Sequence, residues 1–183
     1  MRVITGIARG RKLETLSGND VRPTTDKVKE AIFSSIQFDI EGRRILDLFA
    51  GSGQLGIEAL SRGAKSATFV DLNTDAFAVI ERNLKNTGLK EMAKVMRADY
   101  FSFCAGTCDT FDIAFLDPPY REGILERALG AVTGIMSDYG IIICEHPTDI
   151  TLSDVVGDFT KYKTAKYGKI AVSYYRKERE EIE

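Results

Sequence analysis

Asp117-Pro118-Pro119-Tyr120 closes the largely apolar run Phe111–Leu116. Such a run predicts a buried strand, and the two prolines end it because they remove backbone donors and fix φ. The strand end then carries a carboxylate, carbonyl oxygens without a helix or sheet partner, and an aromatic ring. A flat base with an exocyclic amine needs acceptors for its N–H groups and a ring to stack on. The alternative is an ordinary turn, in which these residue types are also common.

A glycine-rich turn lies within Arg44–Leu60, between an apolar strand and an amphipathic helix. Gly51, Gly53 and Gly56 fit the dinucleotide pattern G-x-G-x-x-G, which is weak when it stands alone. Asp47 separates the candidate ligands. A carboxylate at the strand end repels a pyrophosphate and attracts a cationic amino acid, such as the methionine part of S-adenosylmethionine (SAM). The turn therefore favours SAM over NAD.

Two further strand-like runs, Ser66–Asp71 and Lys94–Asp99, also end in acids. Asp71 lies about twenty residues beyond the glycine turn, where a carboxylate meets ribose hydroxyls. Asp99 is a candidate acceptor for the adenine amine. A single acid at such a position is commonly the N-cap of the next helix. Four acids on successive strands instead predict a ligand site at the carboxyl edge of a parallel sheet. The four acids are Asp47, Asp71, Asp99 and Asp117.

With these motifs the chain resembles class I SAM-dependent methyltransferases, and more narrowly the RsmD family of bacterial 16S ribosomal RNA guanine-N2 methyltransferases. The resemblance extends from about residue 2 to about residue 176. Gln54 departs from it mildly, because a small residue is frequent there. Lys27 and Lys29 stand where arginines are frequent, and we expect these lysines to keep the attraction for phosphate but to lose the bidentate fork of arginine. The resemblance is carried by Arg9-Gly10-Arg11-Lys12, Arg22–Glu30, Asp47–Gly53, Leu55–Ala64 and Asp117–Tyr120.

The resemblance implies a site in which the acceptors of Asp117 and the Pro118 carbonyl hold the guanine amine while Tyr120 stacks on the flipped base. Asp117 also takes the proton during or after transfer in this interpretation. No metal is expected. The expected cofactor-binding residues are Asp47, Phe49, Gly51, Ser52, Gly53, Asp71, Leu72, Asp99, Tyr100 and Asp117.

Two alternatives remain open. One is an amino-methyltransferase that acts on adenine N6 or another exocyclic amine in RNA or DNA. A carboxylate at position 117 favours guanine, because guanine presents its N1–H donor beside N2, whereas many adenine enzymes have Asn there. The other is a SAM-fold protein that binds without catalysis, which we expect to have lost one of the two motifs.

The first residues are basic although the whole chain is not. The formal net charge is −2, which is unpromising for an RNA-binding protein, but Arg2–Lys12 holds four basic residues and no acid. We therefore expect this segment to face 16S rRNA, in assembled or assembling 30S particles; the alternative is a solvated charged hairpin. Lys161, Lys163, Lys166 and Lys169 form a second cluster that fits an exposed strand face. The RNA-binding candidates are Arg9, Arg11, Lys12, Arg22, Thr24, Thr25 and Lys27.

Composition limits the class of protein. The 183 residues, of which 44% are hydrophobic and 28% charged, predict one globular domain. No apolar run is long enough for a membrane span, and the first residues lack a signal-peptide core, so we expect a cytoplasmic protein without an obligate protein partner. Cys104, Cys108 and Cys144 lack zinc spacing and are expected to be reduced.

The predicted fold is α/β: a Rossmann-like class I methyltransferase sheet, mostly parallel with an antiparallel C-terminal strand and with helices on both faces. Residues 1–40 are expected to form an RNA-facing extension, a β-hairpin and a helix, and residues 41–183 the SAM-binding domain. The hairpin strands are predicted at Val3–Ile7 and Leu13–Leu16, and the helix from Thr24 or Thr25 to about Ile36. Later helices are predicted at Gln54–Arg62, about Asp75–Thr87, just after Asp99, and about Ile124–Met136. Four later strands are predicted to end at Asp47, Asp71, Asp99 and Asp117. Three more strands are predicted at Gly140–Glu145, Lys161–Thr164 and Lys169–Tyr175.

Overall fold

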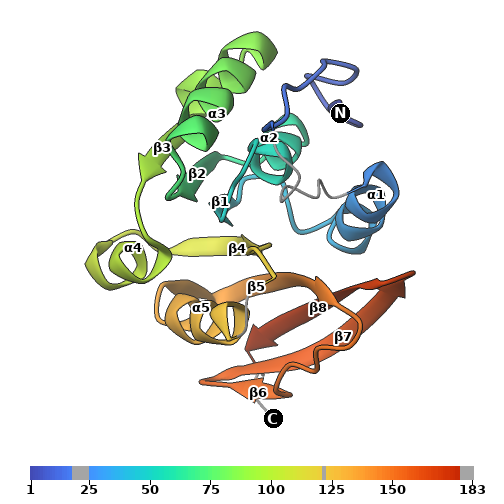
Figure 1. Ribbon diagram of the computed structural model, residues 1–183, viewed down its shortest axis with the longest axis vertical. Helices are drawn as coiled ribbons and strands as arrows, with labels where there is room; N and C mark the ends of the chain where they lie inside the picture. The colour runs from blue at the N-terminus through green and yellow to red at the C-terminus, as the bar shows by residue number, and fades with distance from the viewer. Residues whose placement is uncertain (18–24, 121–122, 178–183) are drawn as a thin grey trace.

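A mixed sheet is the centre of the computed structural model, which describes residues 1–17, 25–120 and 123–177 (Figure 1). Within these residues the sheet has eight strands in the order β3-β2-β1-β4-β5-β8-β7-β6. The first five strands along the chain pair in parallel and the last three in antiparallel fashion. The strands are β1 Arg44–Leu48, β2 Ser66–Asp71, β3 Ala93–Arg97, β4 Phe111–Leu116, β5 Met136–Pro147, β6 Val155–Val156, β7 Phe159–Tyr167 and β8 Ile170–Lys177.

Helices cover both faces of the sheet. One hydrophobic cluster joins α1, α2 and α3 to one face, and a second joins α4 and α5 to the other. This confirms the predicted α/β fold with helices on both faces. None of the described helices combines the length and apolarity that crossing a membrane requires. The helices are α1 Asp26–Ser35, α2 Gln54–Ser61, α3 Thr74–Thr87, α4 Tyr100–Gly106, α5 Ile124–Thr133 and the short 3-10 helix η1 Lys90–Met92.

Parallel pairing brings the ends of the first strands to one edge. Leu48 at the end of β1 is in register with Val70 of β2 and with Leu116 of β4. Cys144 of β5 is in register with Leu116. We call this side, where β1 to β5 end, the carboxyl edge, and the side where they begin the amino edge. Each α-helix that follows a strand starts at the carboxyl edge and runs back toward the amino edge.

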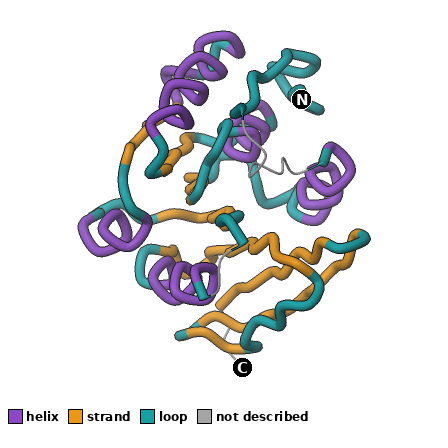
Figure 2. The backbone as a smooth tube through the Cα atoms, in the orientation of Figure 1, coloured by secondary structure: helices purple, strands orange, loops and turns teal. Residues whose placement is uncertain are grey.

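The predicted N-terminal β-hairpin is wrong. The expected strands Val3–Ile7 and Leu13–Leu16 are loop, and the only pairing in this part of the described chain is an isolated antiparallel bridge between Arg2 and Lys12 (Figure 2). The reason lies in where the backbone donors go. The amides of Ile4, Thr5, Ile7 and Ala8 bond to Glu58 and Ser61 of α2, whereas those of Val3 and Leu13 still bond across the loop, to the carbonyls of Arg11 and Met1. We call residues 1–17 the N-terminal loop.

α2 holds the N-terminal loop through its polar side chains. The amides of Ile4 and Thr5 donate to the buried carboxylate of Glu58, at 2.8 and 3.0 Å. Gly6 then has φ +90°, and a Cβ there would lie 1.7 Å from the carbonyl oxygen of Ser61, so the close approach requires glycine. The turn of the loop is therefore fixed at the last residue of α2.

Two helices differ in detail from the prediction. Thr25 is the N-cap of α1, as predicted, and its hydroxyl accepts from the amide of Val28 at 3.3 Å. α5 ends at Thr133, earlier than predicted, because Gly134 is its C-cap and β5 already begins at Met136. The two strands predicted at Lys161–Thr164 and Lys169–Tyr175 are present as the antiparallel pair β7 and β8, and the short strand β6 adds to them.

Lys29 of α1 is buried. Its ammonium donates to the Arg2 carbonyl at 2.7 Å and lies 3.8 Å from the Glu58 carboxylate. Burial lowers the pKa of Lys29, and the neighbouring acids Glu58 and Asp26 oppose this shift. The expectation that this lysine keeps its attraction for phosphate is therefore wrong; its charge holds α1, α2 and the N-terminal loop together.

Candidate active site

A pocket of about 800 Å³ opens at the carboxyl edge of β1, β2 and β4. Its size is in the range of small-molecule sites. The predicted catalytic and cofactor residues that line it are Asp47, Phe49, Gly51, Ser52, Asp71, Leu72, Asp99, Tyr100, Asp117, Pro118 and Tyr120. The further lining residues are Met1, Thr15, Leu16, Ala50, Gln54, Leu55, Val70, Asn73, Ala98, Pro119 and Ile124.

The glycine turn forms the floor between β1 and α2. The amides of Phe49 and Ala50 both donate to the Val70 carbonyl at 3.0 Å, which holds the turn against β2. Phe49 has φ +69°, and it alone among the described non-glycine residues is in the positive-φ region, a strained state that is concentrated at functional sites. Gly53, with φ +79°, does not line the pocket but is the N-cap of α2.

Asp47 is buried in the pocket wall, with 3% of the residue exposed. The amide of Gly56 donates to its Oδ2 at 2.9 Å. Burial raises the pKa of Asp47 to about 7, the amide of Gly56 opposes this, and the nearby charge of Asp71 raises it further. A cation in the pocket would favour the ionised carboxylate. Asp47 is thus suited to a positively charged ligand group.

The next two acids bind backbone amides. Asp71 accepts from Gly51 at 2.9 Å and from Asn73 at 2.8 Å, so it fixes both the glycine turn and its own strand end. Asp99 lies beyond the end of β3 and is the N-cap of α4, with one oxygen accepting from Phe101 and Ser102. Asp99 therefore has two roles, because it caps α4 and also lines the pocket.

Aromatic side chains give the pocket flat surfaces. The rings of Phe49 and Tyr100 are 5.3 Å apart and tilted by 44°. Tyr120 is 46% exposed at the end of the Asp-Pro-Pro-Tyr segment, and Asp117 directly follows β4. The pocket therefore combines acceptors with rings, as binding of a base requires.

Asn83 is a buried residue that the sequence analysis missed. Its amide donates to the carbonyl of Ser52 in the glycine turn at 2.9 Å and to the carbonyl of Glu14 at 3.0 Å, and it accepts from the Glu14 amide at 2.8 Å. It thus joins α3, the glycine turn and the N-terminal loop beside the pocket-lining Thr15. The signal in the sequence that could have identified Asn83 is an amide side chain on the otherwise apolar face of an amphipathic helix.

Gln54 fits a pocket that holds a ligand with N–H groups. It is the first residue of α2, only 7% exposed, and its Oε1 is buried without a hydrogen-bond partner among the described residues. A buried acceptor in that state is costly. Together with the acids and rings, this acceptor suits a cofactor that carries an ammonium group and an adenosine, and so the residues fit SAM.

Sequence comparisons match this chain to a protein family whose named members include methyltransferases, in agreement with a SAM-type site. The family model described as Conserved hypothetical protein 95 matches residues 1–176. The chain belongs to the RsmD family. It is 42% identical over 182 residues to the Bacillus subtilis protein named "Putative rRNA methyltransferase YlbH", covering 97% of this chain and 99% of that one. It is 34% identical over 182 residues to "Ribosomal RNA small subunit methyltransferase D" of Escherichia coli, covering 97% and 90%.

Solved structures show the same fold for this RsmD-family chain. The Escherichia coli structure named "Putative methyltransferase yhhF" superposes with a TM-score of 0.88 at 32% identity, covering 98% of this chain and 99% of that one. A Thermus thermophilus structure, TTHA0928, has a TM-score of 0.82 at 28% identity, covering 96% and 99%. The predicted family and the Rossmann-like methyltransferase fold are both confirmed.

The RNA-binding candidates lie outside the pocket. Arg9, Arg11 and Lys12 are exposed on the N-terminal loop. The loop turns where the Ile7 amide donates to the carbonyl of Ser61, at the amino-edge end of α2, and the length of this eight-residue helix, about 12 Å, separates that turn from the pocket end of the helix. Thr25 caps α1 and Lys27 is exposed, whereas Arg22 and Thr24 lie outside the described residues.

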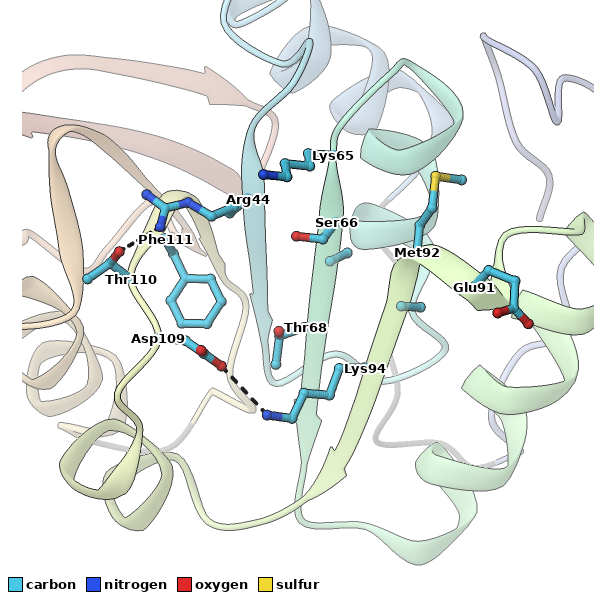
Figure 3. Close-up of a pocket in the computed structure, with 12 residues that line it drawn as sticks. Arg44, Lys65, Ser66, Thr68, Glu91, Met92, Lys94, Asp109, Thr110 and Phe111 are labelled. Atoms are coloured by element: carbon cyan, nitrogen blue, oxygen red, sulfur yellow. Dashed lines mark hydrogen bonds and ion pairs between the residues drawn. The ribbon is translucent and has the colours of Figure 1, made fainter.

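A smaller hollow of about 440 Å³ lies at the amino edge (Figure 3). Three of the five charged side chains that line it form ion pairs. Lys94 lies 3.6 Å from Asp109, and Arg44 donates to Thr110 and to Asp112. The acids that line this hollow, Glu91 and Asp109, are exposed, whereas the pocket at the carboxyl edge holds the buried Asp47.

Proposed function

We propose that this protein transfers a methyl group from SAM to the exocyclic N2 amine of a guanine in 16S ribosomal RNA. One observation carries the proposal: Asp117-Pro118-Pro119-Tyr120 and the SAM-type acids with their glycine turn line one pocket, in a chain of the RsmD family. Relatives named as ribosomal RNA small subunit methyltransferases support the substrate class.

The cofactor half of the pocket is assigned from charge and polarity. Asp47 would hold the ammonium group, Asp71 the ribose hydroxyls and Asp99 the adenine amine. Phe49, Leu72 and Tyr100 would contact the adenine, and Gly51 and Ser52 allow close approach to the backbone. SAM supplies an already activated sulfonium methyl group, so the residues of the protein mainly have to position the acceptor.

The acceptor half is the rigid segment after β4. The carboxylate of Asp117 and the carbonyl of Pro118 would accept the hydrogens of the guanine amine and direct its nitrogen toward the donor. Asp117 would receive the proton that leaves the amine. Tyr120 would stack on the extruded base. Because the two prolines fix the backbone, this geometry is set before the base arrives.

Guanine is favoured over adenine by the acidic residue at position 117. Guanine presents N1–H beside its N2 amine, so a carboxylate meets two neighbouring donors, whereas adenine has an acceptor at N1. The alternative substrate is adenine N6, or another exocyclic amine, in RNA or DNA.

The rRNA would also need holding outside the pocket. The exposed side chains of Arg9, Arg11, Lys12 and Lys27 have no ion-pair partner among the described residues and would bind phosphates. A few such contacts predict weak binding of naked RNA and better binding of assembled or assembling 30S particles. Action on bacterial ribosomal RNA would place the protein in the cytoplasm.

The test is methyl transfer in vitro. The protein, SAM with a labelled methyl group and small-subunit particles that lack the modification are incubated, and the rRNA is digested and analysed by mass spectrometry. The proposal predicts labelled N2-methylguanosine at one position. Labelled N6-methyladenosine would support the alternative, and unlabelled rRNA, both naked and in particles, would refute the proposal.

A further inference from the structure

We propose that the β7–β8 turn, Lys166-Tyr167-Gly168-Lys169, is a second RNA-binding surface. Its two lysines bind phosphates of the rRNA that flanks the methylated base. The inference rests on the proposed function and adds a contact on the side of the pocket away from the N-terminal loop. Four observations on the sheet carry it.

The turn lies at the carboxyl edge. Leu116, the residue before Asp117, is in register with Cys144 of β5. A little further along β5, Pro147 is in register with Ile170 of β8, which pairs with Tyr167 of β7. With three strand spacings of about 4.8 Å between β4 and β7, the turn lies about 15 Å from Asp117 across the sheet.

The backbone of the turn is held in place. The amide of Thr148, just after β5, donates to the carbonyl of Lys169 at 3.0 Å. Tyr167 packs against the hydrophobic core, and Gly168 makes the turn with φ +63°. The lysine side chains therefore project from an anchored base, which lowers the entropy lost when they bind.

The charges of these two lysines are not neutralised. Elsewhere on the hairpin, Lys161 pairs with Asp154 at 2.8 Å, and Lys177 pairs with Asp138 and Asp158. Lys166 and Lys169 are exposed, and neither forms an ion pair or a side-chain hydrogen bond within residues 1–17, 25–120 and 123–177. The exposed Asp149 near the turn pairs with neither lysine.

The turn and the N-terminal loop lie on opposite sides of the pocket. Figure 1 shows the loop beside α2 and α3, and the β7–β8 hairpin at the other end of the molecule. Arg9 and Arg11 lie toward the amino edge, whereas Lys166 and Lys169 lie at the level of Asp117. Uncompensated cations at that level suit a polyanion that already has a base in the pocket.

The test compares two double variants. Lys166→Ala/Lys169→Ala removes the proposed contact. The control Lys65→Ala/Lys85→Ala removes the same charge from two exposed lysines near the amino edge, one just before β2 and one in the last turn of α3. Affinity for a fluorescent rRNA fragment around the modified guanine is measured at increasing salt. We expect the first variant to bind several-fold more weakly at low salt. Loss of two phosphate contacts should reduce the slope of log affinity against log salt by about 1.4 on single strands. The control variant and SAM affinity should not change.

The outcomes separate the inference from the proposed function. The inference is overturned if the turn variant keeps the RNA affinity and salt slope of the control variant. Wild-type protein that methylates no guanine would refute the proposed function, whereas the RNA-binding readout does not depend on activity.

Discussion

Aspartates at the two edges of the sheet have different partners. At the amino edge Asp112 meets the Arg44 guanidinium at 3.0 Å, and Asp109 meets Lys94. At the carboxyl edge Asp47 and Asp71 accept only from backbone amides in the described chain. Carboxylates that already have cations stabilise the fold, whereas carboxylates held by amides beside a pocket remain able to bind a cationic ligand.

The largest expected effect comes from Asp117. Asp117→Ala should lower kcat for methyl transfer by about 100-fold or more, because the acceptor for the amine and its proton is lost. Tyr120→Ala should act in the same direction through lost stacking. SAM affinity should change far less in both variants. The matched control is Asp109→Ala at the amino edge. Near-wild-type turnover of Asp117→Ala on rRNA particles would contradict the assignment.

Substitution of Asp71 should mainly weaken the binding of the cofactor. Asp71→Ala should weaken SAM binding by about 1–3 kcal/mol, because charge-assisted hydrogen bonds to the ribose are lost and the Gly51 amide loses its acceptor. Calorimetry of both proteins measures this, with thermal unfolding as the control for folding. Tight binding of NAD without binding of SAM would exclude the cofactor assignment.

Asp47 predicts a pH dependence of SAM affinity. Burial raises its pKa to about 7, so below that pH SAM binding must expel a proton. Affinity should therefore rise with pH, by at most about tenfold per unit, and level off above pH 7. Titrations at several pH values measure it, with Asp47→Asn as the pH-independent control. Equal slopes for wild type and variant would disprove the role of Asp47.

Asp112 should affect stability alone. Burial raises its pKa, but hydrogen bonds from Arg44 and Ser137 outweigh this and lower the pKa to about 2. Since the folded pKa is below the unfolded one, the stabilisation is present above about pH 4 and is lost as pH falls toward 2. Asp112→Ala should lower the free energy of unfolding by about 1–2 kcal/mol at pH 7, discounted for partial exposure. Urea unfolding at pH 7 and pH 3 tests this, and SAM affinity should not change.

Most of the fold was predictable because its signals are local. The apolar run of β4 and the glycine turn before α2 each specify their own backbone, and the acids follow at strand ends. The predicted hairpin failed because its donors bind Glu58 and Ser61, more than fifty residues away. No local pattern indicates such partners.

The candidate site was predictable to a similar extent. The acids and the Asp-Pro-Pro-Tyr segment share one pocket because strand ends of a parallel sheet share one edge. Thr15 and Leu16 were missed because the path of the N-terminal loop depends on Asn83 of α3. The burial of Lys29 was missed because a lysine on a helix with charged neighbours normally stays in water.

The most direct test compares modified guanines in 16S rRNA from cells with and without this gene. The account predicts that one guanine loses its N2-methyl group in the deletion strain. The wild-type gene should restore the modification, and the Asp117→Ala variant should not, although it is expressed and binds SAM. An unchanged set of methylated guanines in the deletion strain, or full restoration by Asp117→Ala, would contradict the central claim.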